Sequence, residues 1–161
     1  MIGVETDISD DWEIRIDWEA LARRSVHAAL AVSPHAGLAD SEISVLFTSD
    51  EEVRALNRAW RGKDQATNVL SFPMAAPAEL ADAPMLGDVV LARGVCALEA
   101  AEKKISIEAH AAHLLVHGTL HLLGYDHEQS DEAAEEMERL ERRALAAIGV
   151  ADPYELSEVR T

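Results

Sequence analysis

The stretch HGTLHLLGYDH, residues 117–127, places histidines at its first, fifth and last positions and a glycine at its eighth. On an α-helix, residues four apart lie on one face, so His117 and His121 can direct ring nitrogens at a common point. A further ligand on the same straight helix would be carried about 12 Å away over eight residues, beyond the reach of Zn–N bonds of about 2.0–2.1 Å. The chain must therefore turn, and Gly124 can adopt the left-handed conformation that ends helices.

After such a turn, His127 can fold back to the same point. The spacing therefore predicts one metal ion per chain, bound by His117, His121 and His127. Three neutral histidines leave the fourth tetrahedral position open, which is typical of catalytic sites and not of closed structural ones. His110 and His113 continue the histidine stripe, but their distance along the helix axis predicts polar or packed positions for them.

The same spacing is similar to the HExxHxxGxxH signature of metzincin proteases. In those enzymes the residue after the first histidine is a glutamate that acts as the general base. Here that residue is Gly118, which has no side chain to accept a proton. A zinc peptidase or amidohydrolase therefore fits the ligands, while the base that it needs is absent.

Helices and strands are expected on both sides of this segment. Three prolines between residues 73 and 84 predict a mobile surface loop without regular structure. Apolar residues of the acidic last helix recur at helical spacing, so its charges are expected on the solvent side. Residue patterns predict strands at Glu13–Asp17, Ile43–Thr48, Thr67–Phe72 and Gly87–Ala92, and helices at Trp18–Val32, Asp50–Trp60, Arg93–Glu102, Ile107–Leu123 and Asp131–Ile148.

This order of elements predicts a single α+β domain over residues 1–161. Its small mixed four-stranded sheet is expected to be packed with about five helices. The metal site then lies on a central helix and the turn after it.

Composition limits the classes of function. The chain has 161 residues, one cysteine and a formal net charge of −16. It lacks an export signal and a run of about 18 apolar residues, so a cytoplasmic protein with no membrane contact is expected. The net charge argues against general affinity for nucleic acid. Between residues 51 and 70 the balance reverses, because Arg54, Arg58, Arg61 and Lys63 outnumber three acids and give a net charge of +1.

Several motifs together resemble the YbeY family of bacterial endoribonucleases, which are also described as rRNA maturation factors. They occur in the family's order from about Ser44 onward. Two departures are Asn68, where the family often has aspartate, and Trp60, where it often has tyrosine. The matching segments are Leu56-Asn57, Trp60–Asp64, Thr67–Pro73, Leu86–Val90 and His117–His127, with Asp152–Tyr154 similar to the family's tail.

The resemblance implies a metal-dependent hydrolase that cuts single-stranded RNA. It implies zinc as cofactor, His117, His121 and His127 as ligands, and Arg61 as a catalytic arginine. The expected roles are 16S rRNA 3′ end maturation and ribosome quality control. The expected partners are ribosomal RNA, the ribosome or its small subunit, and assembly proteins.

Two further questions remain open from the sequence. A mainly non-catalytic ribosome assembly factor, whose metal stabilises the fold, is an alternative that the net charge of −16 supports. For an RNA-cleaving enzyme, either water or the RNA 2′-hydroxyl can be the nucleophile, and Asp126, Glu128 or His113 can move a proton.

Overall fold

The computed structural model describes residues 2–35 and 41–154, and these form an α+β fold. The predicted mixed four-stranded sheet and its covering helices are confirmed. None of the described helices is long and apolar enough to cross a lipid bilayer. The elements are β1 (Gly3–Ile8), α1 (Trp18–Val32), β2 (Glu42–Thr48), α2 (Asp50–Arg61), β3 (Val69–Pro73), the 3₁₀ helix η1 (Pro77–Asp82), β4 (Met85–Ala92), α3 (Arg93–Lys103), α4 (Ile107–Leu122) and α5 (Asp131–Ala147).

The sheet has the strand order β1-β2-β4-β3. β1 pairs with β2, and β2 with β4, in parallel, whereas β3 runs antiparallel to β4 at one edge. Branched and aromatic side chains of the two central strands, such as Val45, Phe47 and Val89, are completely buried. β3 begins two residues later than the sequence predicts, and β4 begins two residues earlier.

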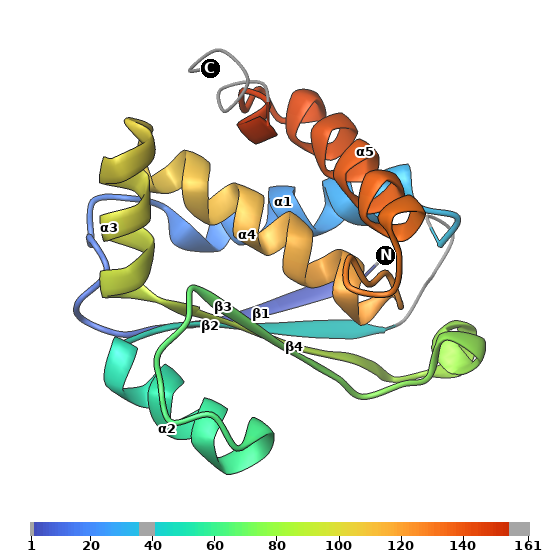
Figure 1. Ribbon diagram of the computed structural model, residues 1–161, viewed down its shortest axis with the longest axis horizontal. Helices are drawn as coiled ribbons and strands as arrows, with labels where there is room; N and C mark the ends of the chain where they lie inside the picture. The colour runs from blue at the N-terminus through green and yellow to red at the C-terminus, as the bar shows by residue number, and fades with distance from the viewer. Residues whose placement is uncertain (1, 36–40, 155–161) are drawn as a thin grey trace.

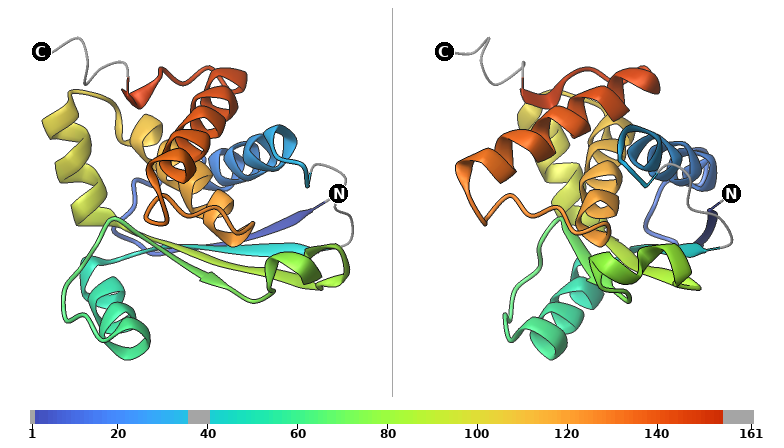
Figure 2. Two further views of the ribbon diagram at one scale, coloured as in Figure 1. Left: turned by 45° about the vertical axis from the view of Figure 1, so that its right-hand side comes forward. Right: turned by 90° about the vertical axis from the view of Figure 1, so that its right-hand side faces the viewer.

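Helices cover the two faces of the sheet unequally. α1, α3, α4 and α5 lie on one face, and α2 lies alone on the other (Figures 1 and 2). α4 is enclosed by the sheet and by the other three helices of its layer, and ten of its sixteen residues are buried. A helix that is apolar on all sides is stable only in such a position. The helix that carries His117 and His121 therefore runs through the interior, as predicted.

Gly118 lets α4 approach the sheet closely. A Cβ atom built at Gly118 would lie 2.8 Å from Val89 Cγ1 and 3.0 Å from Ser71 Oγ. The Ser71 hydroxyl also donates a hydrogen bond of 3.1 Å to the Gly118 carbonyl. Any side chain at this position would push the helix away from the strands, so the glycine fixes the height of α4 above the sheet.

The N-terminal strand prediction is wrong in position. Residues 3–8 form β1, whereas Glu13–Asp17 is a turn. The turn is held by two indoles: Trp12 donates to the Thr48 carbonyl and Trp18 to the Glu13 carbonyl, each at 3.0 Å. Asp17 then caps α1 by accepting from the Ala20 amide. One local tryptophan hydrogen bond and one to a residue distant in sequence thus decide the conformation of a segment whose alternation is typical of a strand.

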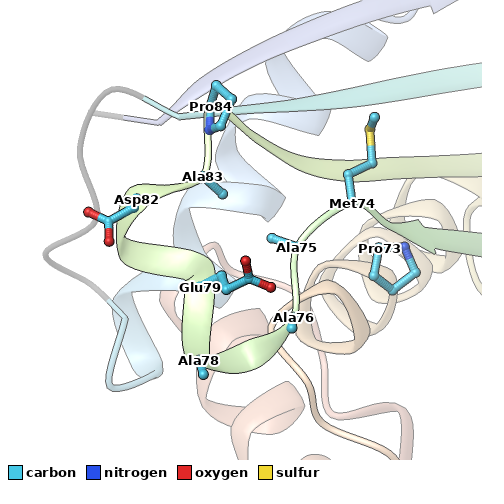
Figure 3. Close-up of a pocket in the computed structure, with 9 residues that line it drawn as sticks. All are labelled: Pro73, Met74, Ala75, Ala76, Ala78, Glu79, Asp82, Ala83 and Pro84. Atoms are coloured by element: carbon cyan, nitrogen blue, oxygen red, sulfur yellow. The ribbon is translucent and has the colours of Figure 1, made fainter.

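The proline-rich segment contains regular structure that the sequence did not predict. Pro77 occupies the start of η1, where its missing N–H costs nothing, and Leu80 is buried against the core. A hollow of about 590 Å³ lies beside η1 (Figure 3). Its lining is small apolar side chains with Glu79 and Asp82, and it contains no histidine or basic residue. Its chemistry therefore does not suit a polyanionic substrate.

The Gly118→Ala variant should be less stable by about 1–3 kcal/mol, the usual cost of overpacking, although alanine favours helices by about 1 kcal/mol over glycine. Urea unfolding followed by circular dichroism measures this. Adding Val89→Ala removes the two Val89 methyl groups that the new methyl meets and leaves the Ser71 hydroxyl. The double variant should therefore lose less stability than the two single losses combined, and strict additivity would contradict the close contact.

Candidate metal centre

The end of α4 is a turn that returns the chain toward its own helix. Gly124 has φ +100°, the left-handed region predicted for it. The Tyr125 amide donates to the Leu120 carbonyl at 3.1 Å, and the Gly124 amide donates to the His121 carbonyl at 3.0 Å. These two bonds form a Schellman cap, the arrangement that glycine favours after a helix. The following residues then carry His127 back beside the helix.

The three predicted ligands come together at this turn. One ring nitrogen from each of His117, His121 and His127 lies within 4.8 Å of the other two. The Nε2 atoms of His117 and His121 are 3.1 Å apart. Two nitrogens on one tetrahedral zinc at about 2.0–2.1 Å each lie about 3.3 Å apart. The donor set and its spacing therefore fit one Zn²⁺ ion.

The ring orientation of His117 also fits a metal ligand. Its Nδ1 lies 2.9 Å from Glu141 Oε2. Because a carboxylate only accepts hydrogen bonds, Nδ1 carries the proton, and in the neutral imidazole Nε2 then presents the lone pair. Burial, together with the neighbouring His117 and His127, lowers the pKa of His121 to about 4. His121 is therefore neutral at physiological pH, as metal binding requires.

Glu141 organises this part of the molecule, and the sequence interpretation missed it. Its side chain is 1% exposed, so the expectation that the charges of α5 face solvent is wrong here. Besides His117, it accepts hydrogen bonds of 2.6 Å from His113 Nε2 and from the Tyr154 hydroxyl. Burial alone would raise the pKa of Glu141, but the bonds from the two histidines outweigh it and hold the pKa at about 2.

A signal for Glu141 was present in the sequence. It lies four residues after Met137, next to Leu140 and three before Ala144, within the apolar stripe of α5. A charged residue on a buried stripe needs partners. The histidine-rich α4 was the element able to supply them.

The two upstream histidines lie away from the tripod, as predicted. His113 is bound to Glu141. His110 is 1% exposed and contacts Glu99 on α3 at 2.8 Å. Burial is the main cause that lowers the pKa of His110, against the opposing effect of Glu99. Within the described residues, neither histidine joins a group able to hold a metal ion.

Arg61 and the tripod line the same pocket, which has a volume of about 580 Å³. Arg61 is the last residue of α2, and Gly62 ends that helix with φ +72°. The loop that follows is held by Asn57, whose side-chain Nδ2 donates a hydrogen bond of 2.9 Å to the Gln65 carbonyl. The pocket is lined by Arg61, Thr67, Asn68, Val69, Ser71, Pro73, His117, His121, Asp126, His127 and Glu128.

The charges around Arg61 distinguish it from a neighbouring arginine on α2. Arg54 is bound to both carboxylate oxygens of Asp64, at 2.8 and 3.1 Å. Arg61 is exposed and forms no ion pair with any residue in the described ranges. Asp126 and Glu128 also reach the pocket, whereas His113 does not line it. The pocket thus combines an unpaired guanidinium, three imidazoles and two carboxylates.

Glu141→Gln should weaken zinc binding about 10- to 100-fold, the usual effect of losing a carboxylate behind a histidine ligand. The glutamine side chain is uncharged and has only one acceptor oxygen, so it cannot accept hydrogen bonds from His113, His117 and Tyr154 as the carboxylate does. Competition with a chromophoric chelator measures the affinity without any assay of activity. Glu135→Gln, an exposed position on the same helix, is the matched control. Wild-type affinity in Glu141→Gln would refute the orienting role of Glu141.

The chain is similar to proteins of one named family. The family described as "Endoribonuclease YbeY" matches residues 6–149. A relative named Endoribonuclease YbeY from Novosphingobium aromaticivorans is 51% identical, covering 96% of this chain and 97% of its own. One of the same name from Rhizorhabdus wittichii is 50% identical, covering 98% and 99%.

A solved structure supports the same fold. The solution structure of TM1509 from Thermotoga maritima matches with a TM-score of 0.56 and 24% identity, covering 91% of each chain. At that identity the match concerns the fold alone. The family match, together with two relatives at half identity over nearly the whole length, shows that the chain belongs to the YbeY endoribonuclease family.

Proposed function

We propose that this protein is a zinc-dependent endoribonuclease that cuts single-stranded RNA. His117, His121 and His127 hold the zinc ion, and Arg61 is the catalytic arginine. The observation that carries the proposal is the shared pocket, because the tripod and Arg61 come from segments more than fifty residues apart and line one cavity. Membership of an endoribonuclease family supports RNA as the substrate.

Arg61 supplies the permanent positive charge of the pocket. Its planar guanidinium can bind two phosphate oxygens at once, and it gives up no ion pair within the described part of the chain to do so. A contact that strengthens as negative charge develops on the phosphate lowers the barrier of cleavage. The other charged groups of the pocket lie on the turn after α4, where Asp126 and Glu128 can exchange protons with the substrate.

The remaining residues hold the ligands in place. Zinc bound at the tripod would polarise a phosphoryl oxygen and lower the pKa of water there. Glu141 keeps His117 in the tautomer that presents Nε2 to the pocket. Gly118 leaves the pocket without the glutamate of zinc peptidases, and a Cβ atom at that position would meet Val89 and Ser71 of the sheet. The site thus offers cation contacts for phosphate and lacks the peptidase base.

The biological substrate proposed is ribosomal RNA. The roles are maturation of the 16S rRNA 3′ end and ribosome quality control, with the small subunit and assembly proteins as partners. The net charge of −16 supports a need for such partners, because phosphate binding depends on basic residues. Sequencing of rRNA 3′ ends in cells that carry His121→Ala or Arg61→Ala tests this role. Unprocessed 16S 3′ ends are expected in both, and normal ends in the Arg61 variant would favour a non-catalytic assembly role.

Two purified variants separate the parts of the site. His117→Ala should lose both stoichiometric zinc and RNA cleavage. Arg61→Ala should keep zinc and lose about 10- to 150-fold in kcat/KM, which corresponds to a charge-assisted contact of about 1.5–3 kcal/mol. Arg58→Ala, an exposed arginine of α2 that does not line the pocket, is the control.

Zinc content by atomic absorption and cleavage of a labelled single-stranded oligoribonucleotide provide the two readings. Full cleavage by a zinc-free His117→Ala protein would disprove the metal mechanism. Equal losses in Arg61→Ala and Arg58→Ala would show that Arg61 contributes general charge only.

A further inference from the structure

The pocket has one wall that the proposed mechanism does not use. β3 is the edge strand of the sheet, and no other strand in the described chain pairs with its outer side. Three alternate residues of this strand, Val69, Ser71 and Pro73, line the pocket beside the tripod and Arg61. These three residues of the edge strand therefore border the space that the substrate enters.

The register shows which backbone groups of β3 are free. Just outside the strand, the Ala92 amide donates to the Asn68 carbonyl at 3.1 Å, and the Met74 amide donates to the Leu86 carbonyl at 3.0 Å. Bonded positions alternate in an antiparallel pair, and the register between these two bonds is regular. Leu70 and Phe72 therefore bond to β4. The N–H and C=O groups of Val69 and Ser71 point away from the sheet.

Two further observations reduce the number of free backbone donors on the outer side of β3. Pro73 lies in the outward phase, where a proline breaks no sheet hydrogen bond because it has no N–H to donate. The Val69 backbone amide already donates a hydrogen bond of 2.7 Å to the side-chain oxygen Oδ1 of Asn68, the preceding residue. What remains between residues 69 and 73 is one donor, the Ser71 N–H, with the carbonyls of Val69 and Ser71 on either side of it.

We infer that this edge binds the Watson–Crick edge of one unpaired nucleobase of the RNA substrate. Every base carries a donor next to an acceptor there: the amino group and ring nitrogen of adenine or cytosine, or the ring N–H and carbonyl of guanine or uracil. One backbone N–H and a neighbouring carbonyl can pair with any of them. In a duplex these base atoms are occupied by the partner strand. The edge thus selects single-stranded RNA without selecting its sequence. This inference rests on the proposed RNA cleavage.

A peptide strand is the other occupant that a sheet edge can accept. Strand addition depends on a row of backbone donors and acceptors, and Pro73 together with the capped Val69 amide leaves only one donor in this stretch. The unpaired Arg61 in the same pocket favours a phosphate-bearing ligand. The observations therefore favour a nucleobase.

The test removes the single donor. Ser71→Pro deletes the outward N–H in the same phase as Pro73, where the sheet hydrogen bonds are kept. Ser71→Ala is its control, because it keeps the N–H and loses only the hydroxyl that donates to Gly118. On a single-stranded oligoribonucleotide with one cleavage site, Ser71→Pro should have a kcat/KM about 3- to 10-fold below that of Ser71→Ala. Zinc affinity and the unfolding transition should be the same in the two variants.

Changes in the substrate locate the contact independently of folding. An abasic nucleotide is placed in turn at each position around the cleaved bond. At one position, the difference between Ser71→Pro and Ser71→Ala should disappear. At that position, 1-methyladenosine or 3-methyluridine, whose Watson–Crick edges are blocked, should weaken binding by the wild-type protein. Equal cleavage by the two variants, or a difference that persists at every abasic position, would overturn the inference.

Binding of a 2′-O-methyl oligonucleotide that gel electrophoresis shows to stay intact, followed by fluorescence anisotropy, separates this inference from the proposed function. If the wild-type protein binds the oligonucleotide with the expected dependence on Ser71 and cuts no RNA, the base contact stands and the proposed cleavage fails. If cleavage depends on zinc and Arg61 but neither binding nor cleavage depends on the Ser71 N–H, the proposed cleavage stands and the base contact fails. A peptide that competes for the pocket only when the Ser71 N–H is present, while RNA does not, would assign the edge to peptides.

Discussion

The hydrogen bonding of the buried Glu141 carboxylate is the interaction on which the proposed metal centre depends. A carboxylate that is 1% exposed is stable only when its oxygens are fully hydrogen-bonded, and here three donors from two separate segments meet it. His113 and His117 come from α4, and Tyr154 comes from the segment after α5. The Glu141 carboxylate therefore both holds α5 against α4 and orients His117, a proposed metal ligand. Arg142 extends the arrangement, because its guanidinium lies 5.1 Å from the centre of the Tyr154 ring and pairs with Asp152.

A second constraint sets where the ligands stand relative to the sheet. Gly118 brings α4 close to β3 and β4, so His117 and His121 lie beside the edge strand. Gly124 then turns the chain, and a Cβ atom there would lie 2.9 Å from Pro77, so the η1 segment packs against this turn. The helix α2, on the opposite face of the sheet (Figure 1), ends in Gly62 and contributes Arg61 to the same cavity. The three histidines, Arg61 and the strand edge thus meet because three glycines allow the backbone to approach or turn.

Local patterns were sufficient to predict most of the fold and the grouping of the tripod. The spacing of His117, His121, Gly124 and His127 was sufficient to predict that the three histidines meet, since helix periodicity and one turn bring them together. The sequence could not show that Glu13–Asp17 is a turn, because the Trp12 indole that holds it bonds to Thr48, which is distant in sequence. Nor could alternation show that Ser71 belongs to an edge strand, which depends on strand order. The position of Glu141 could have been predicted, because it lies on the buried apolar stripe of α5. The expectation that all charges of this helix face solvent overlooked it.

The central claim is that one cavity, with one metal ion and Arg61, cleaves RNA. It is tested most directly by stripping the wild-type protein with a chelator and titrating Zn²⁺ back while zinc binding and cleavage of single-stranded RNA are followed together. The account predicts no cleavage by the stripped protein and a linear return of activity that ends at one zinc per chain. Cleavage that persists without metal, or full zinc binding that restores none, would contradict it.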